Sequence, residues 1–336
     1  MSAAAAGGVG DSATLGDLGE AGILSDIFAG LRTTEVVLVG PGDDTALLAT
    51  SGPVLATTDA MVRGRDWLDE WSSAEDVGAK VVVQNLADLA AMGGVGTGLL
   101  VTLVAPGSLA ARWARGLTAG IGSVADAWGV PVIGGDLSSS DGAVMVSVTA
   151  LGELPGGSAV VRSGSAPGQE VAVSGTLGRS AAGLEILRRS DADWWPAPQR
   201  AEAAAGWVAY HCRPDPDLSE GVRAAQEGAT AMIDVSDGLV RDGGRIASAS
   251  GVRLELDEEA IEALAAEYAP VLGDSAALEC VLGGGEEHSL LATFPAGAVP
   301  QGWTVVARTA EPGAAGPGVW WRGERASGGG WDHFRV

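Results

Sequence analysis

Five short acidic segments are the part of this sequence whose residues could do chemistry. They are Gly40-Pro41-Gly42-Asp43-Asp44, Thr57-Thr58-Asp59, Asn85-Leu86-Ala87-Asp88, Gly134-Gly135-Asp136 and Asp234-Val235-Ser236-Asp237-Gly238. Most follow a run of apolar, strand-like residues, so we expect the carboxylates to lie where strands end. Carboxylate oxygens are the ligands that Mg²⁺ prefers. Since the sequence has no Gly-x-x-x-x-Gly-Lys-Ser/Thr loop, these segments indicate metal-dependent phosphate handling without a P-loop.

Each segment also has a purely structural interpretation. Asp44 could belong to an Asx turn, and Asp59 could cap a helix or lie in a turn. Asp234 and Asp237 lie three residues apart at the start of a predicted helix, where backbone amides can hold an anion. Capping of that helix by Ser236 or Asp237 is the alternative. The loop Gly283-Gly284-Gly285-Glu286-Glu287 could position a substrate or simply end a strand.

The helix predicted over 73–92 carries a polar stripe among Val, Leu and Ala. Lys80, Gln84 and Asp88 share one face by their i, i+4, i+8 spacing. If this face is buried, its polar groups need partners, and otherwise it is a solvated helix face. Ser73 and Asp76 predict a capping box at the start of this helix.

The pattern of apolar residues places these segments on alternating strands and helices. The predicted strands are 35–39, 45–49, 54–57, 98–103, 130–133, 143–151, 170–174, 230–235, 290–294 and 303–307. The predicted helices are 15–31, 73–92, 109–128, 181–189, 218–227, 239–250 and 258–268, with a loop at 194–198. This order favours an α+β fold with two domains. Residues 1–153 are predicted to form a mixed β-sheet covered by helices, and residues 154–336 a C-terminal α/β domain.

The composition excludes several classes of function. The chain has 336 residues, of which 43 are acidic and 20 basic, giving a formal net charge of −23. Such a charge repels nucleic acid and anionic membranes, although solubility alone can explain most of it. Charges, Gly or Pro interrupt every apolar stretch before a membrane-spanning length. Cys212 and Cys280 form no disulfide framework, and the first ten residues do not resemble a signal peptide, so a reducing, cytoplasmic location is expected.

Taken in order, these segments resemble the thiamine-monophosphate kinase family. The resemblance covers nearly the whole chain and rests on residues 18–23, 42–46, 57–59, 85–93, 134–136, 162–164, 211–214, 234–239, 284–286 and 331–334. Any one of these matches is weak, but ten in the same order are specific.

The resemblance implies a fold, a reaction and a set of site residues. The fold is that of the superfamily typified by aminoimidazole ribonucleotide synthetase, with a homodimer formed through the N-terminal sheets. The reaction is phosphorylation of thiamine monophosphate by ATP, giving thiamine diphosphate and ADP, with Mg²⁺ ions and positioning in place of a catalytic base. The implied Mg²⁺ ligands are Asp44, Thr58, Asp59, Asp88, Asp136, Asp234 and Asp237. The implied ATP contacts are Gly135, Asp136, Arg162 and Ser236, and the implied substrate contacts are Asp66, Glu286 and Trp331.

Three positions depart from the family pattern. Asp66 stands where a histidine is usual, Glu287-His288 replaces Asp-Tyr, and Ala87 replaces a serine. The first two concern substrate contacts, so the alternative is a Mg²⁺ and nucleotide-binding member of the same superfamily that is non-catalytic or has an altered substrate.

Overall fold

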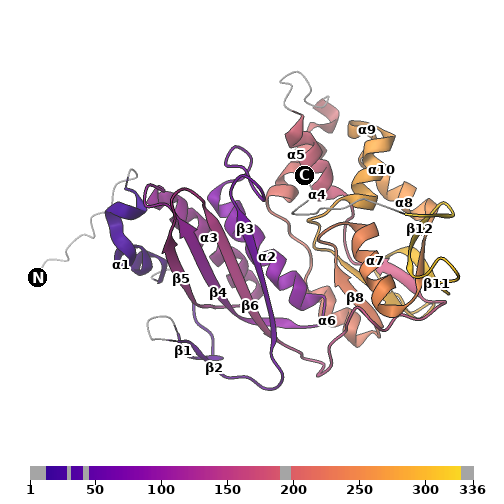
Figure 1. Ribbon diagram of the computed structural model, residues 1–336, viewed down its shortest axis with the longest axis horizontal. Helices are drawn as coiled ribbons and strands as arrows, with labels where there is room; N and C mark the ends of the chain where they lie inside the picture. The colour runs from indigo at the N-terminus through magenta and orange to yellow at the C-terminus, as the bar shows by residue number, and fades with distance from the viewer. Residues whose placement is uncertain (1–12, 29–31, 41–44, 190–197, 327–336) are drawn as a thin grey trace, which may run out of the picture. The chain divides into compact units, whose positions relative to one another are not determined.

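The computed structural model describes residues 13–28, 32–40, 45–189 and 198–326. The chain divides into two compact units. The first is built from residues 1–49, 58–82 and 97–149, and the second from residues 50–57, 83–96 and 150–336. Both combine strands with helices, which confirms the α+β prediction (Figure 1). Asp44 and Trp331 lie outside the described residues.

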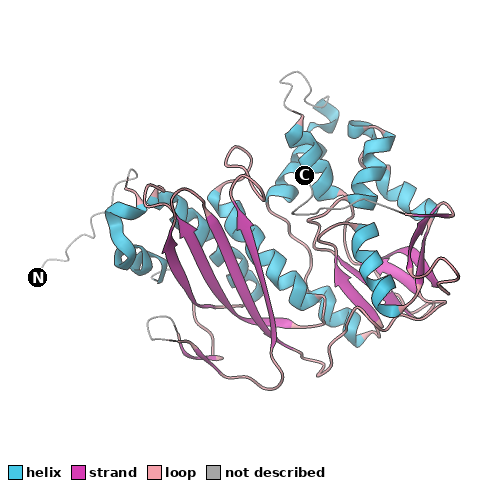
Figure 2. Ribbon diagram, in the orientation of Figure 1, coloured by secondary structure: helices cyan, strands magenta, loops and turns pink. Residues whose placement is uncertain are grey.

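A four-stranded mixed sheet forms the centre of the N-terminal half. Its strands, in spatial order, are β3 (Leu55–Val62), β6 (Met145–Glu153), β4 (Val95–Ala105) and β5 (Val132–Ser139). Strands β4 and β5 run parallel. Helices α2 (Ala74–Ala90) and α3 (Ala111–Trp128) cover the same face of this sheet, and none of the described helices of the N-terminal half lies over the opposite face (Figure 2).

The N-terminal helix α1 (Leu15–Phe28) packs against α3 and precedes a small antiparallel pair, β1 (Val37–Val39) and β2 (Leu47–Leu48). The predicted helix over 15–31 therefore agrees with α1 up to Phe28, and residues 29–31 lie outside the described part. The helix is kinked at Gly19, whose φ of 64° is in the region that favours glycine.

Helix α2 begins with the reciprocal cap that the sequence predicts. The Ser73 hydroxyl accepts the Asp76 N–H at 3.2 Å, and the Asp76 carboxylate accepts the Ser73 N–H at 3.0 Å. These bonds satisfy amides that the first turn of a helix leaves without partners. Further along, α2 and α3 touch through their backbones, because a Cβ on Gly78 would lie only 2.1 Å from the Leu117 carbonyl oxygen. The glycine therefore permits the close packing of the two helices.

Two predicted strand ends are wrong. Strand β3 contains Asp59 and strand β5 contains Asp136, so these carboxylates lie within the sheet and not beyond the ends of strands. Asp and Gly are disfavoured in strands, which is why the sequence suggested turns. The ladder to a neighbouring strand overrides that local preference, as the pairing of Gly135 with Val101 of β4 shows.

The second unit contains a seven-stranded sheet in the order β13-β12-β9-β11-β7-β10-β8, antiparallel except for the β9–β12 pair. Its strands are β7 (Glu170–Val173), β8 (Ala231–Asp234), β9 (Arg253–Leu256), β10 (Leu290–Phe294), β11 (Thr304–Ala310), β12 (Gly318–Trp321) and β13 (Glu324–Arg325). Its helices are α4 (Arg179–Arg188), α5 (Pro198–Cys212), α6 (Ser219–Gln226), α7 (Leu239–Ser250), α8 (Glu258–Ala265), α9 (Ala269–Leu272) and α10 (Asp274–Gly283).

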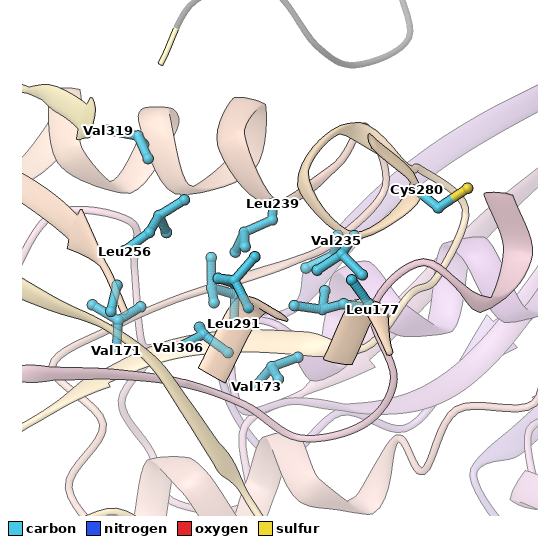
Figure 3. Close-up of a cluster of buried hydrophobic side chains, with 14 of the residues drawn as sticks. Val171, Val173, Leu177, Val235, Leu239, Leu256, Cys280, Leu291, Val306 and Val319 are labelled. Carbon is cyan, nitrogen blue, oxygen red and sulfur yellow. The ribbon is translucent and has the colours of Figure 1, made fainter. Parts of the chain in front are cut away.

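A continuous apolar core joins this sheet to its helices. Figure 3 shows Val173, Leu291 and Val306 of the sheet beside Leu239 of α7 and Cys280 of α10, and all five are buried. This core packs against the end of β8, which carries Asp234, and against the loop before β10, which carries Glu286.

Several elements of the second unit were not predicted, namely α5, α9, α10, β9, β12 and β13. Helix α5 begins at Pro198, the last residue of the predicted loop, and the rest of that loop lies outside the described residues. Proline suits the first position of a helix because its missing N–H has no partner there in any case. The missed strands are only two to four residues long, too short to show a period of two.

Candidate functional site

Asp88, near the end of α2, accepts a hydrogen bond from the hydroxyl of Thr57 in β3 at 2.6 Å. Side chains alternate along a strand, so Asp59 lies on the same face of β3 as Thr57, and Thr58 lies on the opposite face. There the exposed Thr58 hydroxyl donates to the Val148 carbonyl at 3.1 Å. The sequence analysis named Thr57 within its acidic segment but assigned a site role only to Thr58 and Asp59, and the alternation of β3 is the signal that could have added Thr57.

The polar face of α2 is buried at Lys80 and half-buried at Gln84 and Asp88. Lys80 is 3% exposed and Asn85 is fully buried. The Gln84 Oε1 atom is also buried, without a hydrogen-bond partner among the described residues. The face that carries Lys80 is therefore not a fully solvated one, and Asp88 lies half-buried near its end.

Gly135 and Asp136 lie on neighbouring positions of β5 and are both exposed. The Ser138 hydroxyl donates to the Asp136 carboxylate at 2.9 Å. A Cβ on Gly135 would lie 1.9 Å from the Val101 carbonyl oxygen, so strand packing already requires glycine here, whatever else the position does.

A small apolar cavity of about 60 Å³ lies beside this strand, under helices α1 and α3. Its apolar lining includes Leu24, Ile27, Val101, Leu103, Leu117, Ile121, Val132 and Leu137.

Asp234 is the last residue of β8, one residue before the predicted end of this strand, and it is 4% exposed. Its Oδ2 atom lies 3.1 Å from Nδ1 of His288, in the loop between α10 and β10. Asp237 forms an ion pair with Arg245 of α7 at 2.5 Å, and Arg241 approaches the same oxygen at 3.5 Å. Two arginines therefore lie near the Asp237 carboxylate, and one of them, Arg245, is shared with Asp242.

Asp242 organises the start of α7. Its fully buried carboxylate accepts the N–H groups of Asp237 at 2.8 Å and Gly238 at 3.0 Å, and it pairs with Arg245 at 2.5 Å. Burial raises the pKa of Asp242 to about 6, although the Asp237 amide and Arg245 favour the charged form. Capping by Ser236 or Asp237 is therefore the wrong interpretation, because the cap residue is Gly238 and the carboxylate that binds its amide is Asp242.

Glu286 lies in the loop that follows α10, next to Glu287 and His288. Its N–H donates to the Ser236 carbonyl at 2.8 Å, which brings a predicted ATP contact and a predicted substrate contact together. Glu286 and His288 have φ values of 59° and 54°, a conformation that non-glycine residues rarely adopt outside constrained sites. The Glu286 carboxylate lies 3.5 Å from Nδ1 of His211. The end of β8 and this loop thus form one candidate site.

Two further predicted contacts are placed as follows. Arg162 is exposed, and its carbonyl accepts the Ser250 hydroxyl at 3.0 Å. Asp66 follows β3, and its carboxylate accepts the Val62 N–H at 2.7 Å, so it closes a turn there.

Within the described residues, no three His, Cys, Asp or Glu side chains are grouped in a way that could hold a metal ion. The Asp88 carboxylate and the Thr57 hydroxyl, which lie together, both offer oxygen atoms, the donor type that suits Mg²⁺. Cys212 and Cys280 are buried and do not form a disulfide. The described part of the chain also contains no helix that is both long and apolar enough to span a membrane.

Comparison with known proteins first identifies the class of protein to which this chain is similar. Residues 42–154 match the N-terminal domain of the AIR synthase related proteins. A thiamine-monophosphate kinase from Mycobacterium tuberculosis (strain H37Rv) is 40% identical over 304 residues, covering 89% of this chain and 87% of the relative.

Two solved structures agree along nearly the full length. A thiamine-monophosphate kinase from Stenotrophomonas maltophilia K279a has 30% identity and a TM-score of 0.77, with 90% of this chain and 96% of that chain covered. AaThiL complexed with AMPPCP and TMP has 31% identity and a TM-score of 0.75, with coverages of 95% and 98%. The chain belongs to the thiamine-monophosphate kinase family.

Proposed function

We propose that this protein uses ATP to phosphorylate thiamine monophosphate, giving thiamine diphosphate and ADP. The observation that carries the proposal is the 40% identity to the Mycobacterium tuberculosis enzyme over 89% of the chain. It is supported by the fold shared with AaThiL, which was solved with AMPPCP, an analogue of ATP, and TMP.

The reaction needs no protein base. The nucleophile is a phosphate oxygen of thiamine monophosphate, and because the second pKa of a phosphate monoester is about 6, this oxygen is largely ionised at neutral pH. The difficulty is that two polyanions must meet in line. The chain therefore has to bind and orient both phosphates, and we assign this to Gly135, Arg162 and Ser236 on the ATP side.

The donor set fits Mg²⁺, since every proposed ligand offers a hard oxygen. The proposed ligands are Asp44, Thr58, Asp59, Asp88, Asp136, Asp234 and Asp237. When bound, Mg²⁺ would offset the negative charge of the phosphates. Within the protein, the Thr57 hydroxyl orients the Asp88 carboxylate. Asp242 similarly fixes the backbone that carries Asp237.

On the substrate side, we assign Asp66, Glu286 and Trp331 to the thiamine moiety. We also keep the division into an ATP-binding and dimerisation domain, 1–153, and a domain that completes the active site, 154–336. A cytoplasmic location belongs to the same proposal, and two buried cysteines that do not form a disulfide are compatible with it.

Coupled measurement of ADP release, with and without thiamine monophosphate, tests the activity. Release that depends on thiamine monophosphate supports the kinase, whereas tight ATP binding without release supports a non-catalytic, nucleotide-binding protein. The Asp88→Asn variant is expected to lower kcat by about 100-fold or more. Asp126→Asn is the matched control, because Asp126 is a surface residue of α3 that pairs only with exposed Arg32 among the contacts described. Wild-type turnover by Asp88→Asn would remove Asp88 from the site.

We further propose that the protein is a homodimer formed through the open face of the four-stranded sheet. Ala56, Thr58 and Ala60 of β3 are exposed on this face, and Leu100 of β4 is 36% exposed. An apolar side chain on an uncovered sheet favours contact with a second copy. Sedimentation analysis should find a dimer, and Leu100→Glu should shift it toward the monomer. A monomeric wild-type protein would refute this arrangement.

A further inference from the structure

The loop that carries Glu286 has little freedom of its own. Three of its N–H groups donate to the segment that follows β8: Glu286 to the Ser236 carbonyl at 2.8 Å, and Glu287 and His288 to the Val235 carbonyl at 3.2 Å and 3.0 Å. A Cβ on Gly285 would lie 2.4 Å from the Ser236 carbonyl oxygen, so only glycine fits there. The direction of the Glu286 side chain therefore depends on whatever holds this loop in place.

Glu287, the next residue, points into the protein and is fully buried. Its carboxylate accepts the Ser180 N–H at 2.7 Å and the Thr176 hydroxyl at 2.8 Å. Ser180 is the second residue of α4, and the cap residue Gly178 has no side chain to bind the free amides of the first turn. Glu287 therefore caps a helix that lies more than a hundred residues away in the sequence, where a negative charge is favoured.

The same serine also reaches Glu286. The Ser180 hydroxyl lies 3.0 Å from Nδ1 of His211, and this nitrogen lies 3.5 Å from the Glu286 carboxylate. Ser180 and His211 are both buried. The Tyr210 hydroxyl of the same helix α5 donates to the Glu287 carbonyl at 2.8 Å. Backbone and side chains of α4 and α5 thus hold both glutamates at once.

We propose that Glu287 is a positioning residue for substrate binding: through the first turn of α4, Ser180 and His211, it sets the Glu286 carboxylate for the cationic half of thiamine monophosphate. This inference rests on the proposed function, which makes Glu286 a substrate contact. The thiazolium ring carries a fixed positive charge, and a carboxylate held beside it contributes to binding of the substrate before any phosphoryl transfer. Loss of the positioning should therefore weaken substrate binding more than it slows turnover.

Three variants and one control test the proposal. Glu287→Ala removes the carboxylate, and Ser180→Ala removes only the hydroxyl that faces His211. Glu287→Gln keeps the shape of the side chain and an oxygen that can accept the hydrogen bond from the Ser180 N–H. The control is Glu279→Ala, an exposed residue of α10. KM for thiamine monophosphate, KM for ATP and kcat are measured for each, and binding of thiamine monophosphate without ATP is measured by calorimetry.

We expect Glu287→Ala to raise KM and Kd for thiamine monophosphate about tenfold or more, with KM for ATP changed by less than about threefold. Ser180→Ala should show the same selectivity to a smaller extent, Glu287→Gln should restore most of the binding, and the control should match the wild type. If Glu287→Ala does not fold, Ser180→Ala carries the test.

An equal rise of both KM values, or a fall of kcat with unchanged substrate binding, overturns the proposal. Absence of thiamine monophosphate-dependent ADP release in the wild type overturns the proposed function, and this inference with it. The two failures are therefore distinguishable.

Discussion

Replacing Glu287 by glutamine should change how the stability of the protein depends on pH. Glu287 is fully buried, and burial raises its pKa from the ordinary 4.5 to about 7, although Thr176, Ser180, Arg179 and His288 favour the charged form. The other titratable groups that sense its charge are Tyr210, Tyr268 and Cys280. Glutamine keeps the volume of the Glu287 side chain and can still accept the hydrogen bond from the Ser180 N–H, but it cannot ionise.

The magnitude follows from the two pKa values. A rise from 4.5 to about 7 corresponds to about 3 kcal/mol of differential stability between the protonated and ionised forms. Since the folded-state value is the higher one, the stabilising effect of this acid is complete below pH 4.5 and is lost as the pH rises through about 7. About 2.5 kcal/mol of this loss falls between roughly pH 5 and pH 8.

The assay is urea unfolding of the wild type, Glu287→Gln and the exposed control Glu279→Gln at several pH values between about 5 and 8. The free energy of unfolding of Glu287→Gln should rise relative to the wild type by about 2 to 3 kcal/mol across this range, whereas the control should stay parallel to the wild type. A difference that does not vary with pH, or that varies in the opposite direction, would refute the burial argument for Glu287.

Three further outcomes are expected. Ser73→Ala should lower stability by about 1 kcal/mol through loss of the α2 cap, whereas Ser72→Ala should not, as thermal unfolding will show. Val132→Ile should partly fill the cavity of about 60 Å³ and raise stability by about 0.5 kcal/mol or more, and a lower melting temperature would show instead that the cavity cannot take the extra methyl group. Gly135→Ala should destabilise the protein by about 2 kcal/mol or more even without ATP, because its Cβ would meet the Val101 carbonyl. Gly142→Ala, where a Cβ meets nothing within 4 Å, is the control, and equal unfolding curves for the two would contradict this reason for Gly135.

Long amphipathic segments were predictable from the sequence. The α2 and α3 helices occur where apolar spacing and the Ser73-Asp76 pair place them, since those signals act within one or two turns. The strand predicted over 230–235 likewise occurs as β8, one residue shorter at each end. The extensions of β3 and β5 through Asp59 and Asp136 were not predictable, because ladder bonds to other strands stabilise them against the preference of their own residues.

The sequence by itself determined the chemistry that this protein has available: hard oxygen donors in ordered acidic segments, and the family to which those segments belong. Only the tertiary structure decided which groups meet, for example Thr57 with Asp88, Asp242 with the amides before α7, and Glu287 with the first turn of α4. Each of these contacts joins side chains to partners on another element or to backbone amides. Residue spacing specifies the face on which a side chain lies, but the packing of the whole core sets its partner and the pKa that results.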